Sequence, residues 1–380
     1  MRVSLFTDTF VPEINGVART LKRLTDFFEK KNIEYKVFAP EIPDYPFFHS
    51  RIHRLSSFRF FLYPECRVAV PNVLQMKAEL QAFQSHLIHV ATPFNIGLCG
   101  LHYAKKMQVP LVGSYHTNFD HYLRYYDLQF LSNFFWRYMH WFHRSMQKIF
   151  VPSQDTIEQL KRRGFTNLHL WPRGVDCSLF HPYYHQREVR EKYNIDEKYL
   201  LVYVGRIAVE KDVQLLPEIA KRLPESLRDH VHWLVVGDGP LKEEMQQRAP
   251  ERMTFVGYLQ GSDLAKVYAA ADLFVFPSAT ETFGNVVLES LASGTAVIGA
   301  NSGGVKSIMQ HGAFGYLCEP GAIDEFAAAI VRFLSNDTQR KQMELAGRAY
   351  ALTQNWEVIF ENLISEYEKV WRHHAERLHA

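Results

Sequence analysis

The chain has 380 residues, of which 47% are apolar, so it is long enough for two domains with substantial cores. A formal net charge of +2 excludes a generic nucleic-acid-binding protein. The charge is unevenly divided: residues 1–173 contain 22 Lys/Arg and 13 Asp/Glu, whereas the remainder contains 21 and 28. A basic first half and an acidic second half indicate different partners for the two halves.

The cysteines and the N-terminus set the expected compartment. Cys66, Cys99, Cys177 and Cys318 are widely separated and form no C-x-x-C, which argues against a zinc site or a disulfide framework and favours a reducing cytoplasm. The opening "MRVSLFTDTF" is too short for a signal sequence and predicts a buried strand. No apolar run approaches the roughly 18 residues of a membrane span. We therefore expect any membrane contact to be peripheral.

Short apolar runs alternate with amphipathic stretches along the chain. "RVSLFT" predicts a strand, "GVARTLKRLTDFFEKKN" a helix and "YKVFAP" a second strand. Further strands are expected at "HLIHVAT", "LVGSYH", "KIFVPS" and "NLHLWP". In the second half they are expected, with helices between them, at "LLVYVGR", "HWLVVGDG", "MTFVGY", "LFVFPS" and "AVIGA". This alternation predicts an α/β fold whose parallel sheets are covered by helices.

The boundary between two domains is expected within "WPRGVDCSLFHPYYHQREV", residues 171–189. This segment contains Pro172, Gly174 and Pro182, and a new strand begins near Leu200. Two Rossmann-like halves therefore fit better than one barrel. The final stretch "NWEVIFENLISEYEKVWRHHAERL" predicts a strongly amphipathic helix, which also fits a simple cap on the second domain.

The stretch "ETFGNVVLES" places Glu281 and Glu289 eight residues apart, with a helix start between them. A carboxylate accepts two hydrogen bonds from a vicinal diol, and free amides at a helix start bind anions and hydroxyls. The arrangement fits a nucleotide sugar, in which a diphosphate separates a hexose from a ribose. A capping glutamate followed by an ordinary surface glutamate remains the plainer interpretation. The amides concerned belong to Phe283, Gly284, Asn285 and Val286.

Two further motifs are expected at strand ends. In "VYVGRIAVEK", Arg206 and Lys211 follow a strand and suit a diphosphate, although solvated loop cations are an alternative. In "FVPEINGVARTL", Gly16 opens the first helix and would let the backbone approach a phosphate; alone, it also fits a plain turn. The sequence has no complete G-x-G-x-x-G and no G-x-x-x-x-G-K-[ST], which argues against dinucleotide dehydrogenases and P-loop enzymes.

Together, "NGVA", "SYHTNF", "VGRIAVEK", "VVGDGP" and "ETFGNVVLE" resemble the retaining nucleotide-sugar glycosyltransferases of glycosyltransferase family 4. The likeness covers nearly the whole chain. "SYHTNF" and "WPRGVDCSLFHP" look closest to bacterial glycolipid mannosyltransferases and plant sulfolipid synthases. The resemblance implies the GT-B architecture, two Rossmann-like domains facing each other across a cleft. Residues 1–173 would be the acceptor side, residues 174–357 the donor side, and the helix at 358–380 would pack back on the first domain.

The resemblance also implies roles by motif position. Glu281, with the amides of Phe283 and Gly284, would hold the hydroxyls of the donor sugar. Asn285 and Val286 would extend this contact toward the diphosphate.

On the nucleotide side, Glu289 would take the ribose hydroxyls. Arg206 and Lys211 would clamp the diphosphate, which Gly16 would approach from the other domain. The remaining positions are His116, near the reacting carbon, and the backbone of Tyr258 and Leu259, beside the base. No side chain near the base clearly chooses guanine over uracil.

The expected reaction is transfer of a mannose- or glucose-type hexose from a GDP- or UDP-sugar to a membrane glycolipid. The sequence has no D-x-D, so we expect no metal or cofactor, with Arg206, Lys211 and the helix start stabilising the leaving diphosphate. The family implies that the leaving phosphate deprotonates the acceptor on the same face, with retention of configuration. A soluble acceptor, a nucleotide-sugar 2-epimerase with acid/base carboxylates in the first domain, and a non-catalytic nucleotide-binding module are the alternatives.

The acceptor side is expected in the first domain. "RIHRLSSFRFF", residues 51–61, mixes Arg51, Arg54 and Arg59 with phenylalanines, which suits an anionic membrane surface but also fits burial. Thirteen aromatics lie between residues 115 and 150, and there the spacing favours a core stripe. We therefore expect a cytoplasmic enzyme associated peripherally with the inner face of the plasma membrane. Candidates for acceptor hydroxyls are Asn118, Asp120 and His121.

Overall fold

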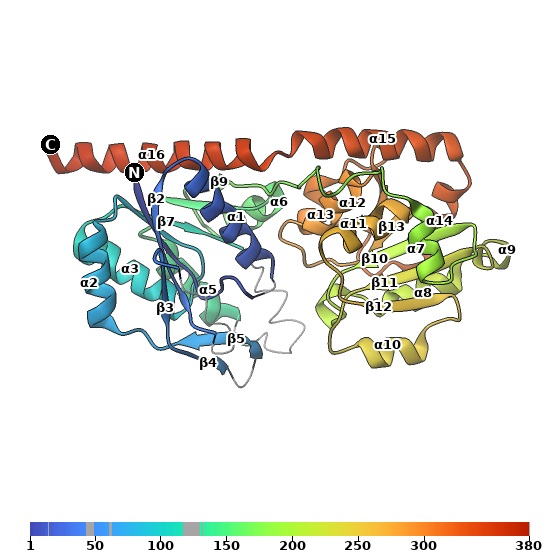
Figure 1. The fold of residues 1–380 in the computed structure, drawn as a ribbon, viewed down its shortest axis with the longest axis horizontal. Helices are drawn as coiled ribbons and strands as arrows, with labels where there is room; N and C mark the ends of the chain where they lie inside the picture. Colours follow the sequence, from blue (N-terminus) through green and yellow to red (C-terminus); the bar gives the residue numbers. More distant parts are fainter. Residues whose placement is uncertain (14, 43–48, 61–62, 117–129, 131, 380) are drawn as a thin grey trace.

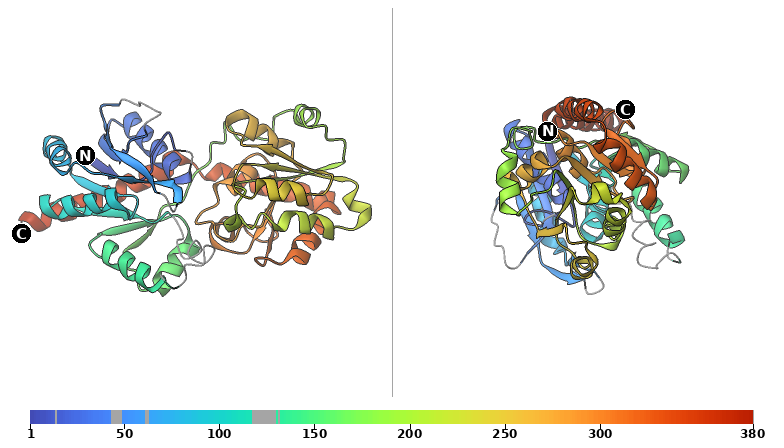
Figure 2. Two further views of the ribbon diagram at one scale, coloured as in Figure 1. Left: turned by 90° about the horizontal axis from the view of Figure 1, so that it is seen from below. Right: turned by 90° about the vertical axis from the view of Figure 1, so that its right-hand side faces the viewer.

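The computed structural model describes residues 1–380 apart from 14, 43–48, 61–62, 117–129, 131 and 380. Within these residues two parallel sheets follow each other along the chain, and helices cover their faces (Figure 1). The two halves lie side by side, as Figure 1 and the left view of Figure 2 show. The expected parallel α/β fold in two Rossmann-like halves is confirmed.

In the described part of the chain the first sheet has seven strands, all paired in parallel. Its central strand β1 (Arg2–Phe6) is buried at every position after Arg2, as expected for a parallel strand with helices on both faces. The strand order reverses between β1 and β6, which makes this the place where a ligand is expected. The order is β3 (Ile52–Leu55), β2 (Glu34–Pro40), β1, β6 (Leu87–Val90), β7 (Leu111–Ser114), β8 (Lys148–Val151), β9 (Leu168–Leu170).

The second sheet repeats this plan with six parallel strands in the described residues. Its order reverses between β10 and β13, so the loops after these two strands meet at the carboxyl edge of the sheet. The order is β12 (Met253–Gly257), β11 (Val231–Val236), β10 (Tyr199–Val204), β13 (Leu273–Phe276), β14 (Val297–Ala300), β15 (Gly315–Cys318).

The helices connect successive strands, and one short hairpin interrupts the pattern. The antiparallel hairpin pairs β4 (Ser57–Phe60) with β5 (Tyr63–Ala69). The first half contains α1 (Gly16–Lys30), α2 (Val73–Phe83), α3 (Asn95–Met107), α5 (Ser132–His143) and α6 (Gln154–Arg162). The second contains α7 (Gln186–Lys192), the 3₁₀ turn η2 (Val209–Lys211), α8 (Leu215–Arg222), α9 (Glu225–Arg228), α10 (Lys242–Arg248), α11 (Gly261–Ala270), α12 (Asn285–Ala292), α13 (Gly303–Ile308), α14 (Ile323–Leu334) and α15 (Asp337–Thr353).

The last helix, α16 (Trp356–His379), returns to the first half. Figure 1 shows it as a long rod that continues from α15 and ends on the side where the N-terminus lies. Its apolar face, which includes Phe360, Leu363 and Tyr367, shares one core cluster with β1 and α1. The C-terminal helix therefore packs against the N-terminal sheet, although α15 just before it packs on α12 of the second half. No helix in the described residues is long and apolar enough to cross a bilayer.

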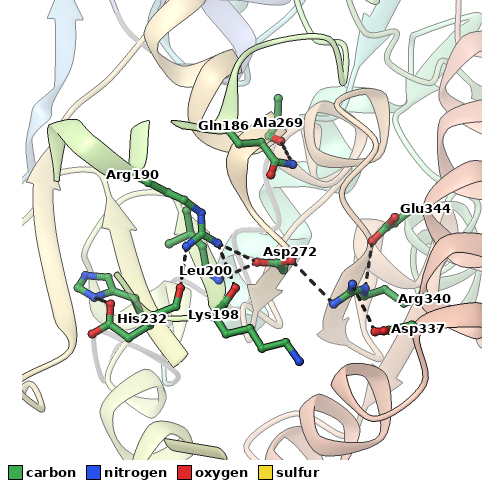
Figure 3. A network of polar contacts seen from close by, with 11 residues as sticks. Gln186, Arg190, Lys198, Leu200, His232, Ala269, Asp272, Asp337, Arg340 and Glu344 are labelled. Carbon is green, nitrogen blue, oxygen red and sulfur yellow. Dashed lines mark hydrogen bonds and ion pairs between the residues drawn. The ribbon is translucent and has the colours of Figure 1, made fainter. Parts of the chain in front are cut away.

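A polar network fastens the amino edge of the second sheet, away from the loops that follow β10 and β13 (Figure 3). Asp272, just before β13, accepts from the amide of Leu200 at 2.8 Å and from Arg190 of α7 at 3.3 Å. Its other oxygen lies 3.8 Å from Arg340 of α15, which also lies 3.8 Å from Glu344. Burial raises the pKa of Glu344 to about 7. This network joins helices α7 and α15 to the second sheet, so we assign it a role in stabilising the fold.

Candidate active site

The loops after β10 and β13 meet through an ion pair. Lys211 Nζ lies 2.5 Å from Glu281 Oε1, although 70 residues separate them in the chain. Arg206, at the start of the same loop, lies 3.2 Å from the carboxylate of Glu210, which is almost fully buried. The structure therefore brings together three of the predicted donor-handling side chains at the switch point of the second sheet.

Hydrogen bonds to the loop after β10 and to helix α13 hold the loop that carries Glu281. Thr280 Oγ1 donates to the carbonyl of Glu210 at 2.7 Å, which ties this loop to the loop after β10. The amide of Gly304 donates to the carbonyl of Glu281 at 2.7 Å. A Cβ at Gly304 would stand 2.2 Å from the backbone of Phe283, so only glycine lets helix α13 approach this closely. The Glu281 carboxylate is thus presented by a braced loop.

The start of α12 lies between the two glutamates, as predicted. Its N-cap is Gly284, with φ +89°, and this residue has no side chain to cover the first helical amides. Phe283 is buried and Val286 packs partly against the core of the second half. The Oδ1 atom of Asn285 is buried and makes no hydrogen bond within the described residues.

Gly16 comes from the other half and faces this helix start. A Cβ built on Gly16 would lie 3.5 Å from the side-chain nitrogen of Asn285. The first turn of α1 and the first turn of α12 therefore approach each other across the domain interface. Amides at two helix starts and an under-bonded side-chain amide converge there, which suits a ligand with phosphate and hydroxyl groups.

Glu289 lies one turn inside α12 and has a perturbed pKa. Burial raises the pKa of its carboxyl to about 7, opposed by the charges of Arg19 and Arg23 on α1 and by a hydrogen bond from Tyr268. Tyr268 Oη donates to Glu289 Oε2 at 3.4 Å, which is a long hydrogen bond. This carboxylate retains most of its capacity to accept hydrogen bonds from a ligand.

Tyr258 and Leu259 follow β12 at the same edge of the sheet. The side chain of Tyr258 is 45% exposed, and its Oη accepts from Arg19 Nη2 of α1 at 2.5 Å. Leu259 packs partly against the core. A contact across the interface therefore stands beside the position expected for the nucleotide base.

His116 follows β7 of the first half and reaches the same loop through its backbone. Its carbonyl accepts from Thr282 Oγ1 at 2.8 Å, between the predicted glutamates. Its ring nitrogens, however, are engaged inside the first half, Nδ1 by Arg173 at 2.8 Å and Nε2 by Ser114 at 2.8 Å. In this structure His116 contributes a main-chain contact to the site, whereas the sequence suggested a role for the residue near the reacting carbon.

The acceptor candidates Asn118, Asp120 and His121 lie outside the described residues. For Arg54 the sequence left open a membrane surface or burial, and in the structure it donates to the carbonyls of Pro40 at 2.9 Å and Val11 at 2.5 Å. It is therefore engaged inside the protein and cannot face a membrane in this conformation.

Helix α5 has two faces. Its inward face is core, as predicted, with Trp136, Met139 and Phe142 buried. Its outward face carries an exposed stripe spaced by three and four residues, so these side chains share one side of the helix. Phe134 is 74% and Trp141 45% exposed in this stripe. We call it the α5 stripe, and it consists of Phe134, Arg137 and Trp141 together with Arg144, which directly follows the end of the helix.

Sequence reasoning missed several residues at the site. Glu210 stands four residues after Arg206, and that spacing within one loop was a usable signal. Thr282 lies within "ETFGNVVLES", but the spacing of that motif does not indicate that its partner is the His116 carbonyl. No nearby sequence pattern indicated a role for Arg19 or Arg173, because their partners Tyr258 and His116 are 239 and 57 residues away in the chain.

Comparison with known proteins identifies the family. The model described as "Glycosyltransferase Family 4" matches residues 14–179, and "Glycosyl transferases group 1" matches residues 185–350. A GDP-mannose-dependent alpha-mannosyltransferase of Mycobacterium tuberculosis is 30% identical over 376 residues, covering 97% of both chains. Sulfoquinovosyl transferase SQD2 of Arabidopsis thaliana is 33% identical over 312 residues, covering 80% of this chain and 60% of its own. Alpha-monoglucosyldiacylglycerol synthase of Streptococcus pneumoniae is 28% identical over 370 residues, covering 93% and 82%.

Solved structures support the same architecture. Sucrose-phosphate synthase from Thermosynechococcus elongatus superposes with a TM-score of 0.82 at 21% identity, covering 98% of this chain and 99% of its own. Anabaena Alr3699/HepE, solved with UDP-glucose, superposes with a TM-score of 0.76 at 18% identity, covering 97% and 99%. The fold is GT-B, as expected. The chain belongs to glycosyltransferase family 4, and its class as a glycosyltransferase is confirmed.

Proposed function

We propose that this enzyme transfers a hexose from a GDP- or UDP-sugar to a membrane glycolipid, with retention of configuration and without a metal ion. The observation that carries the proposal is the meeting of Lys211, Glu281 and the start of α12 at one switch point, with Glu289 one turn away. A carboxylate at each end of an amide-rich helix start matches the hexose–diphosphate–ribose layout of the donor.

The diphosphate would lie between the cations and the helix start. Arg206 and Lys211 already stand at the strand-end loop, each beside a glutamate that holds its position. Because the amides at the start of α12 add partial positive charge, the site favours an anionic leaving group. Preorganised positive charge of this kind stabilises a leaving diphosphate as the glycosidic bond breaks.

The hexose and ribose would lie on opposite sides of that position. Glu281 would accept from hydroxyls of the hexose, and Glu289, with its long single bond to Tyr268, from the ribose diol. Tyr258 and Leu259 would contact the base with Arg19 beside them. Two mycobacterial relatives that match along 97% of this chain are named GDP-mannose-dependent alpha-mannosyltransferases, and these names favour GDP-mannose as the donor.

The acceptor side is supported by relatives and by surface chemistry. Two relatives have a glycolipid in their names, alpha-monoglucosyldiacylglycerol synthase of Streptococcus pneumoniae and a phosphatidylinositol monomannoside mannosyltransferase of Mycobacterium tuberculosis. The α5 stripe alternates exposed aromatic and arginine side chains on one helix face. Such a face suits the interface of an anionic bilayer, where rings enter the headgroup region and guanidinium groups pair with phosphates. We place the enzyme at the cytoplasmic face of the plasma membrane.

The test is a matrix of donors and acceptors. GDP-mannose, UDP-glucose and UDP-galactose are each incubated with vesicles containing diacylglycerol, phosphatidylinositol or a monoglycosyl diacylglycerol, and nucleoside diphosphate release is measured. Release that requires one lipid acceptor supports the proposal. Donor isomerised without an acceptor would indicate the epimerase alternative, transfer to a soluble sugar alone would indicate a soluble acceptor, and binding without turnover would indicate a non-catalytic module.

A further inference from the structure

A chain of buried polar side chains runs from the interdomain linker to helix α16. Arg173 Nη2 lies 2.8 Å from His116 Nδ1, and His116 Nε2 lies 2.8 Å from Ser114 Oγ. The same Ser114 Oγ lies 2.9 Å from His89 Nε2, and His89 Nδ1 lies 2.5 Å from Tyr367 Oη. Segments far apart in the sequence, the linker, two neighbouring strands and the last helix, are thus joined by one series of hydrogen bonds.

The tautomer of His116 follows from the arginine end of this hydrogen-bond chain. A guanidinium group only donates, so His116 Nδ1 must accept and the ring proton must be on Nε2. His116 therefore donates to Ser114 Oγ. The Ser114 and Tyr367 hydroxyls can each accept or donate toward His89, so the constraint from Arg173 ends at Ser114. One arginine thus fixes the tautomer of His116.

Both rings are neutral, which is why the tautomer matters. Burial lowers the pKa of His89 to about 3, and burial together with the charge of Arg173 holds the pKa of His116 well below its ordinary value. Neither ring can satisfy both of its neighbours by taking a second proton at neutral pH.

Arg173 is itself held rigidly. It is buried, and its Nη1 donates to the carbonyls of Trp171 at 2.7 Å and Pro172 at 3.3 Å. Its guanidinium also stacks 4.4 Å from the ring centre of Trp171. The arginine is therefore a fixed donor at the junction of the two halves.

The other side of His116 faces the site. Its carbonyl accepts from Thr282, between Glu281 and Phe283. One residue thus carries both the ring contact with Arg173 and the main-chain contact with the loop that presents Glu281.

We propose that Arg173 is a positioning residue for glycosyl transfer, which fixes the tautomer of His116 and holds this residue so that its carbonyl receives Thr282 across the interface. The kinetic part rests on the proposed function; the tautomer part does not.

The tautomers are measured by long-range ¹H–¹⁵N NMR on the full chain labelled at histidine nitrogen. The wild type is expected to show His116 protonated on Nε2. In Arg173→Met the fixed donor is lost, so Ser114 is free to donate to His116 Nε2, and His116 acquires the Nδ1–H form. Arg173→Lys keeps an obligate donor and is expected to retain the wild-type tautomers. Unchanged tautomers in Arg173→Met would overturn the proposal.

Two further variants keep the test decisive if Arg173→Met does not fold. Ser114→Ala removes the hydroxyl that links the two histidines and leaves Arg173 in place, so His116 keeps its Nε2–H form. Tyr367→Phe removes the hydroxyl at the far end of the hydrogen-bond chain, so His116 again keeps its tautomer. An Nδ1–H form of His116 in either variant would show that Arg173 does not set this tautomer.

Kinetics complete the test. Arg173→Met is expected to lower kcat roughly 10- to 100-fold through misplacement of the loop, with unchanged affinity for the nucleoside diphosphate. Tyr367→Phe is expected to retain kcat. Reversed tautomers with wild-type kcat would overturn the positioning role. A wild type that transfers no sugar would instead overturn the proposed function while the NMR result stands.

Discussion

Glu289 shows how burial prepares one side chain for a ligand. Its carboxyl, on α12, is shielded from solvent and receives one long hydrogen bond from Tyr268. Burial favours the neutral acid, whereas a diol favours the charged carboxylate, because only the carboxylate accepts on both oxygens without donating. Proton release and ribose binding are therefore expected to be coupled at this residue.

This coupling predicts the pH dependence of nucleotide binding. The pKa of Glu289 is about 7, so the free protein carries the neutral acid below that pH and the carboxylate above it. Because the ligand selects the carboxylate, the Kd for GDP or UDP should rise as pH falls below 7, approaching roughly tenfold per pH unit. Calorimetry at several pH values measures this. Glu289→Gln should bind more weakly and lose this part of the slope, while the titration of the ligand phosphate remains; equal slopes in both proteins would contradict the assignment.

A second residue-scale prediction concerns Arg206. Arg206→Ala should abolish turnover, because the diphosphate loses a bidentate donor. The variant also leaves the buried Glu210 carboxylate without this partner, and unpairing a buried charge costs about 3–5 kcal/mol. We therefore expect a lower Tm in Arg206→Ala and recovery of Tm, without recovery of activity, in Arg206→Ala/Glu210→Gln.

The matched control is Arg222→Ala, which removes an exposed ion pair with Asp324 and should leave both turnover and Tm unchanged. Wild-type turnover in Arg206→Ala would remove Arg206 from the diphosphate site.

At the scale of elements, α12 and α5 illustrate two uses of a helix. Helix α12 presents its amino end, because Gly284 leaves the first amides uncovered and β13 delivers the chain at the switch point. Helix α5 presents a side, because its inward positions fill the core and its outward positions alternate aromatic rings with arginines. The first use favours a small anionic ligand, and the second favours an extended anionic surface.

The α5 stripe predicts salt-sensitive binding to vesicles. Phe134→Ser/Trp141→Ser should weaken binding to anionic vesicles, and Arg137→Glu/Arg144→Glu should weaken it further by about 1 kcal/mol or more per charge. Cosedimentation at low and high salt measures both effects. Arg187→Glu, an exposed arginine of the second half, serves as the control and should bind like the wild type. Equal binding of all variants to neutral and anionic vesicles would count against this surface.

At the scale of the whole molecule, the two halves supply different parts of one reaction. The second half holds the cations and both glutamates, whereas the first contributes Gly16, Arg19 and the His116 carbonyl across the interface. Helix α16 ties the halves together, since it follows α15 and then packs on the first sheet. Chemistry at the interface therefore depends on how the halves are held relative to each other.

The cations of the site predict metal independence, and the resemblance to retaining family members predicts retention of configuration. Arg206, Lys211 and the start of α12 can stabilise the leaving diphosphate, so transfer should survive EDTA. The product should keep the donor's anomeric configuration. Glu281→Gln should lower kcat more than Glu289→Gln, because the hexose changes during reaction and the ribose does not. Steady-state kinetics and NMR of the product check these outcomes. A β-linked product from an α-linked donor, or activity lost in EDTA and restored by Mg²⁺ or Mn²⁺, would show that the mechanism is wrong.

The sequence alone determined the parallel α/β fold and the strand-end positions of Gly16, Arg206, Lys211 and Glu281. Apolar runs of strand length alternate with helical periodicity, and in such folds strand-end loops gather at one edge, so their meeting could be predicted. The division of α5 into core and surface faces was only half predicted, because spacing shows that residues share a face without showing which face is covered.

Only the tertiary structure showed which individual residues distant in the chain contact each other. Spacing reveals neighbours on one loop or one helix face, but Arg173 and His116 meet across 57 residues, and Thr282 meets the His116 carbonyl across 166. The same reason applies to Arg54, for which the sequence left open a membrane surface or burial and which the fold placed against the carbonyls of Pro40 and Val11. Whether a charged side chain faces solvent, a ligand or a buried carbonyl depends on the packing of elements around it, and that packing is a property of the whole fold.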